Sequence, residues 1–418
     1  MRAFFAALAL LVAALAARAE PTVILLSWDG VRHDYPERVP PGALARMQRE
    51  GARAERLVPV FPSSTFPGHV SLATGTWPDR HGIVDNQFID RERGEFRMGN
   101  DASWIEAEPL WAAAERQGVP AAVYFWVGSE SDWHGQRVHE RVAPFDTSVS
   151  EHEKVTRMLG WLAEEGPARP RLLMSWWHGA DHVGHERGPD AAGVAEALRE
   201  QDAELGALLA GLDARDAWRD TTLLVVSDHG MTSVRREVPL RRALADAGVR
   251  ARVAGGATVA HIFFDDPSQR KRAEAALAPL EGIRVYRRES LPDALRIRHP
   301  TRTGDLVVVA DLGVALVESP LSERLLRGIG SLFGWERGMH GYAPEEPDMG
   351  GILFALGRGV PAGRSLGVVR MVDVAPTVAR LLGIEPPSGS EGRPIAGIGE
   401  SADAYRPTGD GVGAPERK

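Results

Sequence analysis

The feature that most restricts the fold is a recurring pattern in which a short, almost wholly apolar run ends at an acidic or histidine residue. The run at residues 21–27 ends close to Asp29, and the run at residues 222–227 leads into Asp228 and His229. Such runs are typical of strands that are buried on both faces, as in a parallel sheet covered by helices. Helix-like segments alternate with them, which indicates βαβ units. The sequence therefore predicts an α/β fold with a mostly parallel sheet between helices.

Further elements are expected where other apolar or amphipathic runs occur. The strand-like runs are residues 121–127, 172–177 and 351–356, and the helix-like runs are residues 109–117, 193–212 and 373–382. Gly383 follows the last of these in the position of a helix C-cap. Ligands bind at the carboxyl ends of the strands in open α/β sheets, so we expect the polar residues that follow the strands to form one site.

The N-terminal segment is typical of a secretory signal peptide. Arg2 precedes an uncharged run at residues 3–17, and Ala17 and Ala19 are small residues at the positions that determine signal-peptidase cleavage. This run is short for a membrane span, although an uncleaved anchor is the alternative. We therefore expect cleavage of residues 1–19, a periplasmic or secreted protein, and no transmembrane segment afterwards.

A catalytic domain is expected over residues 20–400. Within it, the stretch at residues 239–331 holds several short apolar runs and a helix-like segment at 268–280, and we interpret it as a small α+β insertion that caps the site. The alternative is that this stretch continues the main sheet. Residues 401–418 are rich in glycine, proline and charge, as is typical of a flexible tail.

The amino-acid composition excludes several classes of metal site and of catalysis. The 418 residues include no cysteine, which excludes disulfides, thiolate catalysis and cysteine-held zinc or iron–sulfur clusters. Any metal is therefore held by histidine, carboxylate and hydroxyl groups. The formal charge is −8, from 49 basic and 57 acidic residues. This charge disfavours binding to nucleic-acid polymers but is compatible with a local metal site.

Three carboxylates and three imidazoles follow the expected strands or lie in glycine-rich segments. They are Asp29, Asp181, His185, Asp228, His229 and His340. His185 follows Asp181 by four positions, so a helical turn brings both to the same ion. Each of these residues taken alone is more often a helix cap or a surface group, and their recurrence at one sheet edge favours a metal site. Asp and His ligands without cysteine suit zinc, with manganese or iron as weaker alternatives.

A hydroxyl-rich stretch at residues 61–75 is the second chemical signal. Two prolines restrict the backbone around Ser63, Ser64 and Thr65, and an apolar helical run follows. A hydroxyl at a helix N-terminus lies where backbone N–H groups favour an anion. A threonine becomes a useful nucleophile when a metal lowers the pKa of its hydroxyl. The alternative is that these hydroxyls only cap the helix.

Six motifs occur in a fixed order along the chain. They lie at residues 27–32, 61–75, 78–86, 181–185, 227–231 and 338–341. In this order they resemble the motifs of the nucleotide pyrophosphatase/phosphodiesterase family, within the alkaline phosphatase superfamily. The resemblance covers residues 23–383, since the helix expected at 373–382 is similar to the one that closes this superfamily's fold. It implies an alkaline-phosphatase-like, mostly parallel sheet sandwiched by helices.

The resemblance also implies the metals. It implies two zinc ions, with other divalent metals as alternatives. The ligand sets that it implies are Asp181, His185 and His340 for one ion, and Asp29, Asp228, His229 and the Thr65 oxygen for the other. The spacing of two such ions suits an in-line displacement at phosphorus, because both the attacking and the leaving oxygen are stabilised.

Further residues receive roles from the same resemblance. Thr65 would attack phosphorus and form a phospho-threonine intermediate. Asn86, together with the backbone N–H of Phe66, would bind a phosphate oxygen. Phe66 and Trp176 would sandwich a nucleobase, although Trp176 at the end of a buried run can equally be a core residue.

The expected activity is that of an exported dizinc phosphodiesterase and nucleotide pyrophosphatase, acting on a small-molecule substrate and releasing nucleoside monophosphate. Two departures from the family's pattern leave the leaving group open: Gly68 precedes His69, and Gly179-Ala180 precedes Asp181. The surrounding stretch is also similar to glycolipid ethanolamine-phosphate transferases. The alternatives are a phosphodiesterase for phospholipid headgroups or other alkyl phosphodiesters, a phosphomonoesterase, and a metal-binding protein without activity.

Overall fold

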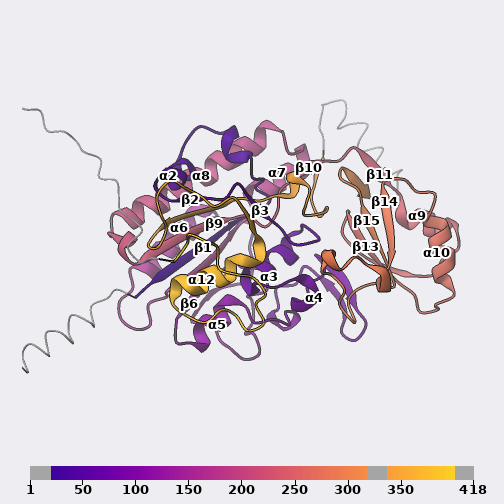
Figure 1. Cartoon of the computed structure of the whole chain (residues 1–418), viewed down its shortest axis with the longest axis horizontal. Helices are drawn as coiled ribbons and strands as arrows, with labels where there is room; N and C mark the ends of the chain where they lie inside the picture. The colour runs from indigo at the N-terminus through magenta and orange to yellow at the C-terminus, as the bar shows by residue number, and fades with distance from the viewer. Residues whose placement is uncertain (1–19, 318–336, 401–418) are drawn as a thin grey trace, which may run out of the picture.

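The computed structural model describes residues 20–317 and 337–400. The expected signal peptide at 1–19, the expected tail at 401–418 and residues 318–331 of the expected insertion lie outside the described residues. The described chain forms a larger α/β body with a smaller lobe at one side (Figure 1). Within these ranges, no helix has the length and hydropathy that a membrane span requires.

The central sheet of the larger body is mostly parallel, as predicted. In order across the sheet, its strands are β19 (Arg364–Ser365), β2 (Ala52–Arg53), β18 (Leu353–Gly357), β9 (Thr221–Val226), β1 (Thr22–Trp28), β8 (Leu172–Trp177), β6 (Ala121–Tyr124) and β7 (Glu140–Val142). The neighbours from β9 to β7 pair in parallel. The strand expected at residues 351–356 forms as β18, but it runs antiparallel to both of its neighbours.

Helices cover both faces of this sheet because side chains on both faces of its strands are apolar. In β1, Val23 and Leu25 belong to one buried core, and Ile24 and Leu26 belong to the other. The helices of the first core are α3 (Thr65–Thr74), α5 (Leu110–Arg116) and α12 (Val374–Leu382), and those of the second are α2 (Ala43–Glu50), α6 (Glu151–Leu162) and α8 (Ala192–Asp213) (Figure 1). Burial of each such side chain stabilises the fold by about 1.5–3 kcal/mol.

The boundaries of several elements follow the sequence pattern closely. The strand expected at 172–177 is β8, and the helix expected at 193–212 is α8. Gly383 adopts the left-handed conformation at the end of α12, with φ of 74°, which glycine reaches without a Cβ clash. The strand expected at 121–127 ends three residues early, at Tyr124, because Phe125 adopts a positive φ of 62° and the chain leaves the sheet.

The smaller lobe has an antiparallel sheet of its own, so this stretch does not continue the main sheet. Its strands, in order across the sheet, are β12 (Arg252–Gly255), β13 (Val259–Phe263), β15 (Leu306–Ala310) and β14 (Ile283–Arg287). The helices α9 (Leu240–Asp246) and α10 (Gln269–Leu277) pack against this sheet through a separate apolar core. Its role as a cap over the site stays a prediction.

Candidate active site

The acidic residues of the site converge because β9, β1 and β8 are neighbours in the sheet. Asp29 follows β1 directly, and Asp228 follows β9 after one residue. Asp181 lies in the first turn of α7 (Gly179–Arg187), which begins after β8. The backbone N–H of Gly30 donates to Asp228 Oδ1 at 3.1 Å and so connects the ends of two strands. The expected meeting of these carboxylates at the carboxyl edge of the sheet is thus observed.

The three histidines are oriented in the same way. Each has its Nδ1 within hydrogen-bond distance of a backbone carbonyl oxygen. The pairs are His185 with Gly338 at 3.1 Å, His229 with Gly230 at 2.9 Å, and His340 with Ser63 at 3.0 Å. A carbonyl can only accept, so Nδ1 is the donor in each pair and Nε2 is the nitrogen that remains to bind a metal. Such backbone contacts are the usual way in which metal-binding imidazoles are oriented.

One compact group of possible metal ligands contains Asp29, Asp228 and His229. The Nε2 atom of His229 lies 3.4 Å from Asp29 Oδ1 and 3.2 Å from Asp228 Oδ2. One ligand atom from each residue lies within 4.8 Å of the others. All three residues are buried, with exposed fractions of 3% or less. This group contains the two carboxylates and the imidazole of one of the two ligand sets implied by the resemblance.

A second compact group contains Asp181, His340 and again His229, whose ring stacks on that of His340 with centroids 3.7 Å apart. His185, which was expected as a ligand here, lies beside this group. Its Nε2 is 3.4 Å from Asp181 Oδ2, and its ring centroid is 4.9 Å from that of His340. The two groups share one imidazole, so they form a single continuous cluster.

The chemistry of this cluster fits divalent cations. Oδ1 of Asp29, Oδ1 of Asp181 and Oδ2 of Asp228 are buried without a hydrogen-bond partner among the described residues. Burial, and then the nearby carboxylates, raise the pKa of Asp29 well above its ordinary value. Burial and the neighbouring imidazoles lower the pKa of His340 well below its ordinary value, so this ring stays neutral. Carboxylates and imidazoles are the ligands that zinc takes when cysteine is absent.

Thr65 and Asn86 lie at the edge of the same cluster. Thr65 is the first residue of α3, and its Oγ1 is 3.3 Å from His229 Nε2. The backbone N–H of Phe66 donates to Asn86 Oδ1 at 2.8 Å. The Phe66 N–H, which was expected to bind a phosphate oxygen together with Asn86, is thus bonded to Asn86 itself, and the Nδ2 group of Asn86 is left as a donor. The N-terminus of α3 adds a positive end of a helix dipole at this position.

The two aromatic residues expected to sandwich a nucleobase are both buried. Trp176 is 7% exposed, stacks on Phe145 with centroids 4.6 Å apart, and donates its indole N–H to Asp29 Oδ2 at 3.0 Å. Phe66 is 5% exposed, and Phe96 packs edge-on against it. Neither ring presents an open face in this structure. The indole of Trp176 instead orients the carboxylate of Asp29, a candidate metal ligand.

Sequence reasoning gave no role to His69, although the structure places it in the site. It is fully buried in α3, and its Nδ1 lies 2.8 Å from the Thr65 carbonyl oxygen and 3.3 Å from Asp228 Oδ2. The signal that could have found it is its spacing of four residues from Thr65, which brings both to one side of a helix.

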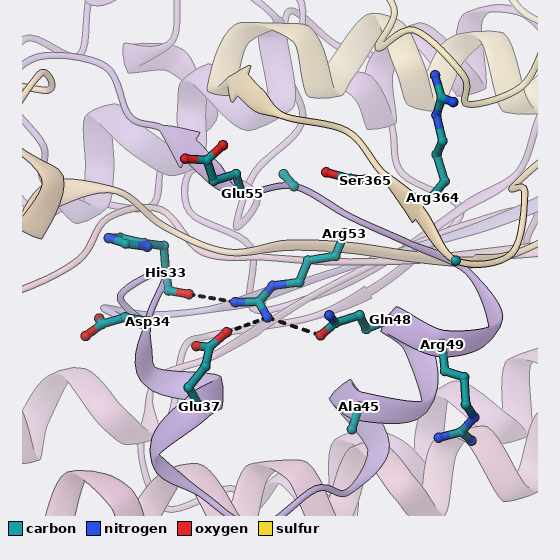
Figure 2. A pocket seen from close by; sticks show the side chains of 12 residues that line it. His33, Asp34, Glu37, Ala45, Gln48, Arg49, Arg53, Glu55, Arg364 and Ser365 are labelled. Atoms are coloured by element: carbon teal, nitrogen blue, oxygen red, sulfur yellow. Dashed lines mark hydrogen bonds and ion pairs between the residues drawn. The ribbon is translucent and has the colours of Figure 1, made fainter.

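A hollow of about 800 Å³ lies away from these residues, between α2, β2 and β19 (Figure 2). Figure 2 shows that Arg53 at its centre is already paired. Arg53 contacts Glu37 at 2.6 Å, Gln48 Oε1 at 3.1 Å and the His33 carbonyl oxygen at 3.0 Å. None of the candidate metal ligands lines this hollow, so we do not assign the reacting phosphate to it.

Comparison with known proteins gives consistent matches. The family model of type I phosphodiesterase / nucleotide pyrophosphatase matches residues 23–343. A pyrophosphatase/phosphodiesterase of Schizosaccharomyces pombe is 31% identical over 354 residues, which are 81% of this chain and 71% of that protein. Human ectonucleotide pyrophosphatase/phosphodiesterase family member 5 is 27% identical over 370 residues, 87% of this chain and 74% of that protein.

Solved structures agree with these sequence matches. Murine ectonucleotide pyrophosphatase/phosphodiesterase 5 superposes with a TM-score of 0.79 at 26% identity, covering 87% of this chain and 96% of that one. An inactive threonine-to-alanine form of the murine protein, in complex with AMP, superposes with a TM-score of 0.80 at 25% identity, covering 88% of this chain and 96% of that one.

The fold and the cluster of ligands define a metal-dependent hydrolase of phosphate esters in the alkaline phosphatase superfamily. More narrowly, the chain belongs to the type I phosphodiesterase / nucleotide pyrophosphatase family, whose members hydrolyse phosphodiester or pyrophosphate bonds. The family inferred from the six motifs is thereby confirmed.

Proposed function

We propose that this chain hydrolyses nucleotide phosphodiester or pyrophosphate bonds through a phospho-threonine intermediate at Thr65 and releases nucleoside monophosphate. The observation that carries the proposal is the position of Thr65 Oγ1, at the N-terminus of α3 and 3.3 Å from His229 Nε2. The murine protein that is inactive as a threonine-to-alanine form and binds AMP supports both the nucleophile and the substrate class.

The proposal includes two zinc ions. The ligands would be Asp181, His185 and His340 for one ion, and Asp29, Asp228, His229 and the Thr65 oxygen for the other. Ions bound here would supply positive charge for the attacking and leaving oxygens and lower the pKa of a coordinated hydroxyl. The partnerless carboxylate oxygens and the shared orientation of the imidazoles support this assignment.

The side chains around the phosphate have separate tasks in this proposal. Thr65 Oγ1 forms a bond to phosphorus while the bond from phosphorus to the first leaving oxygen breaks. Asn86 Nδ2 and the N-terminus of α3 bind a non-bridging phosphate oxygen. Water then cleaves the phospho-threonine ester, which frees the second product and restores Thr65. Contact of Phe66 and Trp176 with the base stays a prediction; their burial restricts such contact to the rims of the rings.

A comparison of three chromogenic substrates tests this function. We expect kcat/KM to be highest for para-nitrophenyl thymidine monophosphate, and the Thr65→Ala variant to lose this turnover. A higher efficiency on para-nitrophenylphosphocholine would favour a phospholipid or alkyl phosphodiester, and faster release from para-nitrophenyl phosphate would favour a monoesterase. If zinc-loaded protein turned over none of the three, the chain would be a metal-binding protein without this activity.

We further infer that the mature protein is periplasmic or secreted. Similar proteins carry the name ectonucleotide pyrophosphatase/phosphodiesterase, which supports action outside the cytoplasm. N-terminal sequencing of the protein from an extracellular or periplasmic fraction tests this inference, and a mature protein that begins near Glu20 is expected. Recovery of the uncleaved chain from membranes would favour the anchor.

A further inference from the structure

Asp85 joins the residue next to it, Asn86, to the smaller lobe. Its side chain is buried, with an exposed fraction of 2%. Oδ1 accepts the backbone N–H of Asn86 at 2.7 Å, and Oδ2 accepts the backbone N–H of Gly256 at 3.1 Å. Gly256 lies in the turn between β12 and β13. A single carboxylate therefore connects a turn of the smaller lobe to the segment that carries Asn86.

These hydrogen bonds continue to the nucleophile. The side-chain oxygen of Asn86 accepts the N–H of Phe66 at 2.8 Å, and Phe66 directly follows Thr65 in α3. Asn86 is thus held at its backbone by Asp85 and at its side-chain oxygen by α3. Its Nδ2 group is directed by two contacts, one of which depends on Asp85.

The same turn of the smaller lobe also packs against the metal-ligand side of the site. Gly341, which follows His340, has a φ of +95°, and a Cβ atom placed on it would overlap the Thr258 hydroxyl and lie 3.1 Å from Ser64 Oγ. Residues 255–258 therefore approach the site at two places, beside Asn86 and beside His340. The turn therefore packs directly against the site and is not a remote surface loop.

We propose that Asp85 is a positioning residue, through which the β12–β13 turn of the smaller lobe fixes Asn86 for contact with the substrate phosphate. This inference rests on the proposed phosphate-binding role of Asn86. Burial raises the pKa of Asp85 to about 7, while the two N–H donors favour its ionised form. The ionised carboxylate carries no proton, so both of its oxygens are free to accept the N–H groups of Asn86 and Gly256. The connection between the turn and Asn86 is therefore strongest when Asp85 is ionised.

A double-mutant cycle tests this role with para-nitrophenyl thymidine monophosphate as the substrate. Asn86→Ala is expected to lower kcat by about 100-fold, as loss of one donor to a developing oxyanion does. Asp85→Asn preserves shape but offers only one accepting oxygen, so one N–H loses its partner; we expect kcat to fall about tenfold. If Asp85 acts through Asn86, the double variant loses about 100-fold, no more than Asn86→Ala alone.

The outcomes separate this inference from the proposed function. Multiplied losses, about 1000-fold in the double variant, would overturn the positioning role, since independent effects add as free energies. If Asp85→Asn acted only by destabilising the whole protein, the losses would also multiply. The reason is that an unfolded fraction lowers the apparent kcat both in the wild type and in the Asn86→Ala variant. An unchanged kcat in Asn86→Ala would remove the proposed phosphate contact and this inference with it. Asp266→Asn, the same chemical change at an exposed residue of the smaller lobe, should leave kcat unchanged.

Discussion

Asp29, Asp181 and Asp228 each bury an oxygen that no described group hydrogen-bonds. Burying three neighbouring carboxylates is costly even with imidazoles beside them, so we expect cations bound at this place to stabilise the folded protein. We expect a chelator to lower the melting temperature of the zinc-loaded protein by roughly 5–10 °C, because each site at 100-fold saturation contributes about 2.7 kcal/mol.

Thermal unfolding with and without chelator measures this effect, and added zinc should reverse it. The Asp228→Asn variant is the control, since it lacks one of the proposed ligand carboxylates and should show a smaller chelator shift. Equal melting temperatures of the loaded and stripped wild-type protein would contradict a metal role for the cluster.

The second prediction at this scale concerns Thr65. Because Thr65 Oγ1 would form the bond to phosphorus, Thr65→Ala should lower kcat by at least about 1000-fold, as removal of a nucleophile does in other hydrolases. Its melting temperature should stay within a few degrees of the wild type, since only a hydroxyl and a methyl group are removed. Acid-quenched wild-type protein should carry a nucleotidyl group on the peptide with Thr65, measured by mass spectrometry. A Thr65→Ala variant that retains turnover would remove the nucleophile from the mechanism.

The buried carboxyl of Asp85 also predicts a pH dependence of stability. Burial raises its pKa from the ordinary 3.8 to about 7, so between these values the folded chain holds a proton that the unfolded chain has lost. The contribution of this carboxyl to the free energy of unfolding therefore falls as the pH rises from about 4 to about 7, by roughly 4 kcal/mol at most. Above about pH 7 this contribution no longer changes. Asp85→Asn lacks this titration. Urea unfolding at pH 5 and pH 8 should show that the variant gains stability relative to wild type at the higher pH, and a constant difference would argue against the raised pKa.

At the scale of helices and strands, the sequence alone predicted the elements whose own residues form a local pattern, such as an apolar run or a capping glycine. The apolar runs predicted β8 and α8, and the glycine after α12 predicted its end. The direction of β18 could not be predicted, because an apolar run has the same composition in a parallel and an antiparallel strand. The lone carboxylate Asp85 was missed for a related reason, since its partner Gly256 is 171 positions away and belongs to another sheet.

The close packing of α7 on β17 (Gly338–Met339) gives a prediction at this scale. A Cβ atom on Gly338 would overlap the carbonyl oxygen of Gly184 in α7, and a backbone atom cannot move aside cheaply. The Gly338 carbonyl also orients His185. Gly338→Ala should therefore weaken zinc binding about tenfold or more, measured by competition with a chromogenic chelator.

A second glycine-to-alanine change provides the control. Gly160 lies inside α6, and a Cβ atom there meets open space. Gly160→Ala should leave zinc affinity unchanged and stabilise the helix by up to about 1 kcal/mol. Equal zinc affinities of the Gly338 variant and this control would show that the packing of α7 on β17 does not set the position of His185.

At the scale of the whole molecule, the smaller lobe is attached to the larger body by buried polar contacts beside the site. Arg302, in the segment that leads into β15, is 1% exposed. Its guanidinium donates to Asp90 Oδ2 at 2.8 Å and to the Gly82 and Trp104 carbonyl oxygens at 2.8 and 2.9 Å. Asp90 ends β4 (Gln87–Asp90), the strand that begins directly after Asn86. The lobe and the segment that carries Asn86 are therefore connected through Asp85 and through Arg302, and Arg91 beside Asp90 adds contacts to the Thr303 carbonyl oxygen and to Asp305.

Removal of this second connection should weaken the whole structure. Arg302→Ala leaves the buried Asp90 carboxylate without its cation, and breaking one partner of a buried pair costs about 3–5 kcal/mol. Urea unfolding followed by tryptophan fluorescence measures the change.

Arg284→Ala is the matched control, because Arg284 pairs with Asp311 at an exposed surface, where a pair contributes at most about 1 kcal/mol. Since β4 continues from Asn86, the Arg302 variant should also show a lower kcat at urea concentrations where it is still folded. If both variants unfolded at the same urea concentration as the wild type, the buried arginine would not be what couples the smaller lobe to the site.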